Sequence, residues 1–110
     1  MKLPNRENAY VPQAKLTGYL LSATHSVGKG KAGFFRLFGF DETSSGLLEN
    51  ALLAIARQEE VREVSPSPHG TKYVIKGLLQ TPTGRPVQVL TVWIIEPGQE
   101  RPRFVTAYPA

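Results

Sequence analysis

The stretch TKYVIKGLLQTPTGRPVQVLTVWIIE (residues 71–96) contains two apolar runs joined by a short polar segment. Tyr73, Ile75 and Leu79 fall on one face of the first run, because side chains in a strand alternate between its two faces. The other face of that run has a more basic set: Lys72, Val74 and Lys76. TPTG places proline and glycine where a hairpin turns. The second run is apolar on both faces, which is typical of a central strand covered on both sides.

Two further strands are expected around this hairpin. VREVS (61–65) alternates like a strand, and SPSPHG (65–70) is expected to be a loop because its two prolines resist regular structure. PGQE turns the chain after the hairpin, and RFVTAYP (103–109) is the predicted last strand. The second half of the chain is therefore predicted to be an antiparallel meander of about four strands.

Helices are expected in the first half. PQAKLTGYLLS (12–22) and KAGFFRLF (31–38) have apolar residues at helical spacing, and Gly39 stands where the second helix would stop. A third helix, roughly 45–59, follows several possible N-caps in DETSS and carries Leu48, Leu52 and Ile55 at helical spacing. Helices followed by a meander predict an α+β fold with the N-terminal helices packed on one face of the sheet. We expect a single domain over residues 1–110.

The amino-acid composition argues against several classes of protein and of functional site. The chain has no cysteine and two histidines, so we expect no disulfide, no thiolate site, no metal site and no cofactor. No segment is long and apolar enough for a signal peptide or a membrane span, so we expect a cytoplasmic protein that does not bind membranes. The net charge of +4 combines two basic regions with an acidic one over residues 41–63. A basic face suits a polyanion, although charge that only keeps the protein soluble is the alternative.

The segment HSVGKGK (25–31) is the first candidate site. A glycine-flanked loop that enters a helix can aim its backbone N–H groups at an anion, here through Gly28 and Gly30, with Lys29 and Lys31 adding charge. The spacing fits neither a Walker loop nor a dinucleotide fingerprint. The alternative is a flexible basic turn. His25 lies among serine and threonine residues and is a candidate acid–base group, because its intrinsic pKa is near neutrality.

The last predicted strand is the second candidate site. Thr106 and Tyr108 are two residues apart, so they share a face of the strand, and Phe104 is expected on the same face. A hydroxyl and a phenol side by side can bind a phosphate oxygen or orient a base. The alternative is a terminal strand made of ordinary strand-forming residues.

These motifs together resemble a family of small uncharacterised bacterial proteins that open near LPN, continue through YLL…H..G..KA.FF..LGF and close with TVW…TAYP. The resemblance covers essentially the whole chain. Its matching positions are Leu3 to Asn5, Tyr19 to Leu21, His25, Gly28, Lys31, Ala32, Phe34, Phe35, Gly39, Phe40, Thr91 to Trp93, and Thr106 to Pro109. The family brings no established activity with it.

More distantly, the order of features resembles the barnase, EndoU, colicin and RelE group of ribonucleases, many of them toxin domains. The resemblance implies a metal-independent ribonuclease in which His25, Lys31, Thr106 and Tyr108 face one cleft, with Lys29 a less secure match. It also implies RNA as substrate and a cognate acidic inhibitor protein as partner. In such a site histidine would move a proton and lysine would stabilise charge on the phosphate.

Two other functions remain open from the sequence. No second acid–base group is evident unless Tyr108 or a lysine serves, which favours a non-catalytic basic module that binds a protein partner or nucleic acid. An immunity or scaffold protein is the third alternative, but it explains neither His25 nor Tyr108. The ribonuclease hypothesis requires these two residues to lie on the same side of the molecule.

Overall fold

The computed structural model describes residues 1–22 and 28–110, with the backbone alone at 28 and 29. It confirms the α+β prediction: helices occupy the N-terminal half, and a four-stranded antiparallel sheet of order β1-β2-β3-β4 follows. The strands are β1 (Glu63–Ser67), β2 (Gly70–Leu79), β3 (Val87–Ile95) and β4 (Arg103–Pro109). The helical elements are η1 (Arg6–Asn8), α1 (Gln13–Lys15), the π-helical η2 (Leu16–Leu20), α2 (Gly28–Leu37), η3 (Glu42–Ser44) and α3 (Ser45–Gln58).

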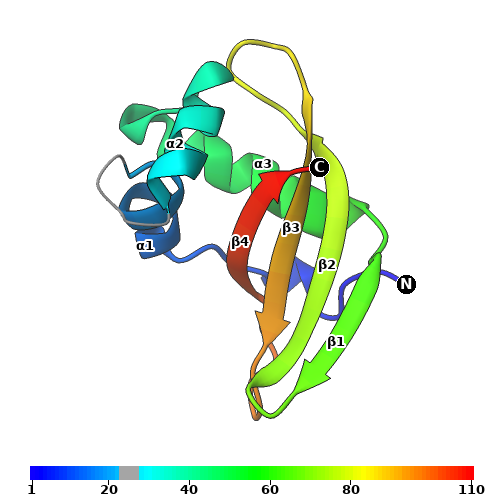
Figure 1. The fold of residues 1–110 in the computed structure, drawn as a ribbon. Helices are drawn as coiled ribbons and strands as arrows, with labels where there is room; N and C mark the ends of the chain where they lie inside the picture. Colours follow the sequence, from blue (N-terminus) through cyan, green and yellow to red (C-terminus); the bar gives the residue numbers. More distant parts are fainter. Residues whose placement is uncertain (23–27) are drawn as a thin grey trace.

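The helices cover one face of the sheet and the edge formed by β4. Figure 1 shows α3 crossing behind the long, curved β2 and β3, while α1 and α2 lie beside β4. β1 forms the opposite edge of the sheet. This arrangement leaves one sheet face, here called the open face, without a layer of helix from the described residues.

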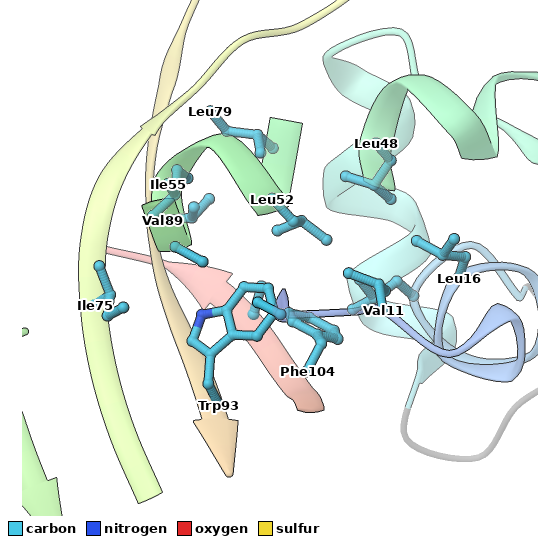
Figure 2. Packing of buried hydrophobic residues seen from close by; sticks show 14 of the residues in the cluster. Val11, Leu16, Leu48, Leu52, Ile55, Ile75, Leu79, Val89, Trp93 and Phe104 are labelled. Carbon is cyan, nitrogen blue, oxygen red and sulfur yellow. The ribbon is translucent and has the colours of Figure 1, made fainter. Parts of the chain in front are cut away.

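The core lies between α3 and the covered face of the sheet. Figure 2 shows Leu52 and Ile55 of α3 above Ile75, Trp93 and Phe104 from three strands, all of them buried. The rings of Trp93 and Phe104 meet edge to face with centroids 5.2 Å apart, a favoured arrangement for aromatic pairs. The core therefore unites the amphipathic third helix with the hairpin strands that the sequence predicted.

The close approach of α3 to β2 requires a glycine. A Cβ atom built on Gly77 would lie 2.9 Å from Cγ2 of Ile55, which is closer than such atoms normally come. The missing side chain lets the helix pack directly against the strand. Gly77 thus sets the spacing between the helix layer and the sheet.

A β-bulge changes the orientation of the last strand. Phe104 pairs with Trp93, but Thr106 pairs with Val92, so the register shifts between neighbouring positions of β3. One extra residue in a strand reverses the alternation that follows it. Phe104 consequently points into the core, whereas Thr106 and Tyr108 occupy the open face. The prediction that Thr106 and Tyr108 share a face is correct, and the placement of Phe104 with them is wrong.

Several element boundaries also differ from expectation. The residues Gly28 to Gly30, expected in a loop, form the first turn of α2. Pro66 and Ser67, expected in a loop, belong to β1. Pro66 is tolerated there because an edge strand has one side free of ladder hydrogen bonds. The third helix, expected at about 45–59, spans Ser45–Gln58.

β3 is the apolar strand that the sequence placed at the centre of the sheet, and it pairs with β2 on one side and β4 on the other. Its covered face is buried at Val89, Thr91 and Trp93. Its open face carries Leu90 and Val92, which are half-buried, and Ile94, which is buried. Among the described residues, the centre of β3 is therefore fully covered on the helix side and only partly covered on the open face.

Candidate functional site

The candidate site lies along β4, where α1, η2 and α2 come against this strand. Lys31 projects from α2, and its Nζ donates a hydrogen bond to the carbonyl oxygen of Ala107 at 3.4 Å. The same ammonium lies 5.3 Å from the ring centroid of Tyr108. A cation at this distance is attracted by the negative face of an aromatic ring. Tertiary packing thus joins two predicted site residues that are far apart in the sequence.

Thr106 is held by a residue of the first helical segment for which the sequence predicted no role in a site. The phenol of Tyr19, in η2, and the hydroxyl of Thr106 are 3.1 Å apart and share a hydrogen bond. Lys15, at the end of α1, places its Nζ 5.0 Å from the centroid of the Tyr19 ring. The four-residue spacing of Lys15 and Tyr19 in a helical segment was the available signal, because side chains at i and i+4 lie on one face.

We call this group the β4-edge cluster. It consists of Lys15, Tyr19, Lys31, Thr106 and Tyr108. Its members come from four elements and offer two ammonium groups, two phenols and one hydroxyl. All five can donate a hydrogen bond, so the cluster suits an acceptor-rich anion such as a phosphate.

The cluster is accessible, and no carboxylate of the described residues neutralises its lysines. Tyr108 is 36% exposed, and Lys15, Lys31 and Thr106 are half-buried. Among the ion pairs formed by the described residues, none involves either lysine of the cluster. Both ammonium groups therefore keep N–H donors for a ligand, since each has three.

Arg36 is a cation of α2 with a different role. It forms an ion pair with Glu42 and donates to the carbonyl oxygen of Leu21 at 3.3 Å. A backbone hydrogen bond and the neighbouring Arg36 hold the pKa of Glu42 below its usual value. Arg36 therefore ties α2 to η3 and to the end of the η2 segment.

The remaining predicted residues fall into two groups. Gly28, Lys29 and Gly30 belong to the first turn of α2, where backbone N–H groups lack helical partners, so an anion-binding role stays a prediction. His25 belongs to residues 23–27, which lie outside the described residues. Its predicted role in catalysis is therefore carried forward as a proposal.

The chain belongs to the DUF6883 family, described as a domain of unknown function, which matches residues 2–110. A search among curated proteins finds no match. Among solved structures, the fold is similar to a chain from a contact-dependent growth inhibition toxin–immunity protein complex of Klebsiella pneumoniae 342. The TM-score is 0.72 with 13% identity, and the match covers 94% of this chain and 95% of that chain. At this low sequence identity, the similarity shows that the two chains share a fold.

No helix among the described residues is both long and apolar enough to cross a membrane.

Proposed function

We propose that the chain is a metal-independent ribonuclease domain of the toxin kind, with the β4-edge cluster as its phosphate site. The observation that carries the proposal is the meeting of Lys31 with Thr106 and Tyr108. Lys31 contacts the strand between these two residues, at the carbonyl of Ala107, and also faces the Tyr108 ring. These are three of the four residues that the distant resemblance to ribonuclease toxins selects.

The reaction needs no nucleophile from the protein. The 2′-oxygen of a ribose forms a bond to the adjacent phosphorus, and the bond from phosphorus to the 5′-oxygen of the next nucleotide breaks. A base accepts the 2′-hydroxyl proton, and an acid supplies a proton to the departing 5′-oxygen. The products are a 2′,3′-cyclic phosphate and a free 5′-hydroxyl, so atoms and protons balance.

The residues divide this work in a simple way. His25 transfers a proton, as base or as acid, because its ordinary pKa lies near the operating pH. Tyr108 or a lysine of the cluster takes the second proton-transfer role. The Lys31 ammonium stabilises the negative charge that grows on the phosphate oxygens, and the Thr106 hydroxyl donates a further hydrogen bond.

The comparison of folds supports a role in a toxin system. The similar solved structure comes from a complex of a toxin with its immunity protein. A ribonuclease of this kind would need a cognate inhibitor in the cell that makes it. An acidic inhibitor fits best, because it would complement the cations of the β4-edge cluster.

The test is an RNA cleavage assay in EDTA. The wild-type protein is expected to cut single-stranded RNA and leave 2′,3′-cyclic phosphate ends. Lys31→Ala and His25→Ala are each expected to lower the rate about 100-fold or more, in line with the loss of one transition-state contact or proton-transfer group. Arg57→Ala, which removes an exposed cation from α3, is the matched control and should cleave normally. Normal cleavage by Lys31→Ala would refute the assigned site.

A non-catalytic binding module is the second candidate. An apolar hollow of about 370 Å³ lies between α3 and residues 80–82, and Leu47 at its rim is 57% exposed. An exposed apolar surface of this kind is typical of protein–protein contacts. Salt-sensitive RNA binding without cleavage, or binding of a protein partner that Leu47→Asp abolishes, would favour this function.

A further inference from the structure

A second hollow, partly polar, lies on the open face of the sheet next to the β4-edge cluster. It has a volume of about 460 Å³, within the range of roughly 300–1,000 Å³ typical of small-ligand sites. Its lining combines two cations, one carboxylate and an apolar floor with a phenol at one side. The lining residues are Arg62, Glu63, Val74, Lys76, Leu90, Tyr108 and Ala110.

Strand register explains why these side chains meet. Lys76 of β2 stands opposite Leu90 of β3, and Leu90 stands opposite Tyr108 of β4. This row crosses three strands, so its two ends lie about 10 Å apart at the usual strand spacing. A neighbouring row runs from Glu63 through Val74 and Val92 to Thr106. Both rows end at the β4-edge cluster.

The cations of the hollow, Arg62 and Lys76, form no ion pair within the described part of the chain. Arg62 is exposed just before β1, and Lys76 is half-buried in the middle of β2. Leu90 and Val74 are both half-buried and form an apolar surface between these two cations and the Tyr108 ring. A ligand that matches this lining carries negative charge at one end and a flat apolar body.

We propose that the open-face hollow binds one nucleotide of a single-stranded RNA, beside the phosphate held by the β4-edge cluster. The identity of the ligand as RNA rests on the proposed function. A phosphate on Arg62 and Lys76 would place the base over Leu90 and towards the ring of Tyr108. Single-stranded nucleic acids are bound in this way, by cations that follow the backbone and aromatic rings that contact the bases.

The carboxylate of Glu63 gives the hollow a preference among polyanions. It would repel a phosphate, so we assign the phosphate contacts to Arg62 and Lys76 and a hydrogen-bond donor of the ligand to Glu63. It accepts hydrogen bonds only, and the donors that a nucleotide offers are its ribose hydroxyl and the amino or ring N–H groups of its base. The hollow is therefore suited to a nucleotide and less suited to an inorganic polyphosphate, which has no such donor.

The test measures binding separately from cleavage. The probe is a fluorescein-labelled hexamer of adenosine nucleotides with a 2′-O-methyl group on every ribose, which cannot be cut because its 2′-oxygens carry no proton. The adenine amino groups remain as hydrogen-bond donors to Glu63. Fluorescence anisotropy gives the affinity at several salt concentrations. Arg62→Ala and Lys76→Ala are each expected to weaken binding about tenfold, as for the loss of a charged hydrogen bond. Each should also reduce the slope of log K against log salt by about 0.7, the value for one phosphate contact on a single strand. Arg57→Ala again serves as the control and should bind with wild-type affinity.

The outcomes separate this inference from the proposed function. If Arg62→Ala and Lys76→Ala bind the hexamer like the wild type, or if the wild type does not bind it, the hollow is not a nucleotide site. Loss of cleavage in Lys31→Ala would then still support the ribonuclease. If the two variants weaken binding but the wild type never cleaves RNA, the nucleotide site stands and the ribonuclease proposal fails. A wild-type affinity equal for the hexamer and for inorganic polyphosphate would also refute the inference.

Discussion

Replacing Thr91 by valine removes one hydroxyl from the centre of the sheet and should destabilise the protein measurably. Thr91 is fully buried in β3. Its hydroxyl donates to the carbonyl oxygen of Ile75 at 2.9 Å and accepts from Nε1 of Trp93 at 2.8 Å. Valine has nearly the same shape, so the change tests the hydrogen bonds with little change in packing.

The expected loss of stability in Thr91→Val follows from these two hydrogen bonds. The indole N–H of Trp93 would be left buried without its acceptor, which costs about 1–3 kcal/mol. A buried methyl group in place of the hydroxyl returns about 0.8 kcal/mol. The lost hydrogen bond to the Ile75 carbonyl adds about 0.5–1.5 kcal/mol. The free energy of unfolding should therefore fall by about 1–4 kcal/mol. Because Thr91 pairs with Ala107, whose carbonyl binds Lys31, the same change tests the support beneath the β4-edge cluster.

Urea denaturation followed by circular dichroism measures this difference. Thr71→Val is the matched control, because Thr71 is half-buried in β2 and its hydroxyl has no hydrogen bond to the other described residues. That variant should change stability by less than about 0.5 kcal/mol. In a Trp93→Phe background the indole N–H is absent, so Thr91→Val should cost about 1 kcal/mol less than in the wild type. An equal cost in both backgrounds would refute the assigned role of the hydroxyl.

Two further predictions concern stability. Gly77→Ala should lower the free energy of unfolding by about 1–3 kcal/mol, because the new Cβ would press on Ile55 and move α3, and thermal unfolding measures this. An unchanged melting temperature would show that α3 can move away from the new Cβ with no loss of stability, and would contradict this prediction. The second prediction concerns pH. The Thr43 hydroxyl and backbone N–H both donate to Asp41, which holds the pKa of that carboxyl below its ordinary value of 3.8. Asp41 therefore contributes stability above about pH 4 that is lost as the pH falls further. Melting temperatures between pH 7 and pH 3 should show a smaller acid-induced drop in Asp41→Asn, and an identical drop would contradict this.

Much of the fold could be read from local patterns. The alternation in residues 71–96 predicted β2 and β3, because a strand that buries one face must place an apolar residue at every second position. Helical spacing of leucines predicted α3 almost to its ends. The α+β class followed from the order of these elements, since helices before a meander have one sheet face available to cover.

The site could be predicted only in part. Lys31, Thr106 and Tyr108 were selected from their residue types, but nothing local indicates that α2 lies against β4. Tyr19 was missed as a partner of Thr106, because its spacing was equally that of a core residue. Local patterns report which face a side chain takes and cannot report which distant element that face meets.

The sequence by itself determined the periods, the charges and the chemical groups, because these depend on residues close to one another in the chain. The tertiary structure decided the bulge that turns Phe104 into the core and leaves Thr106 and Tyr108 on the open face. It also decided the two rows that run from Lys76 and Glu63 to the β4 edge. Both features depend on register, which is set by how whole strands pack against α3 and against each other.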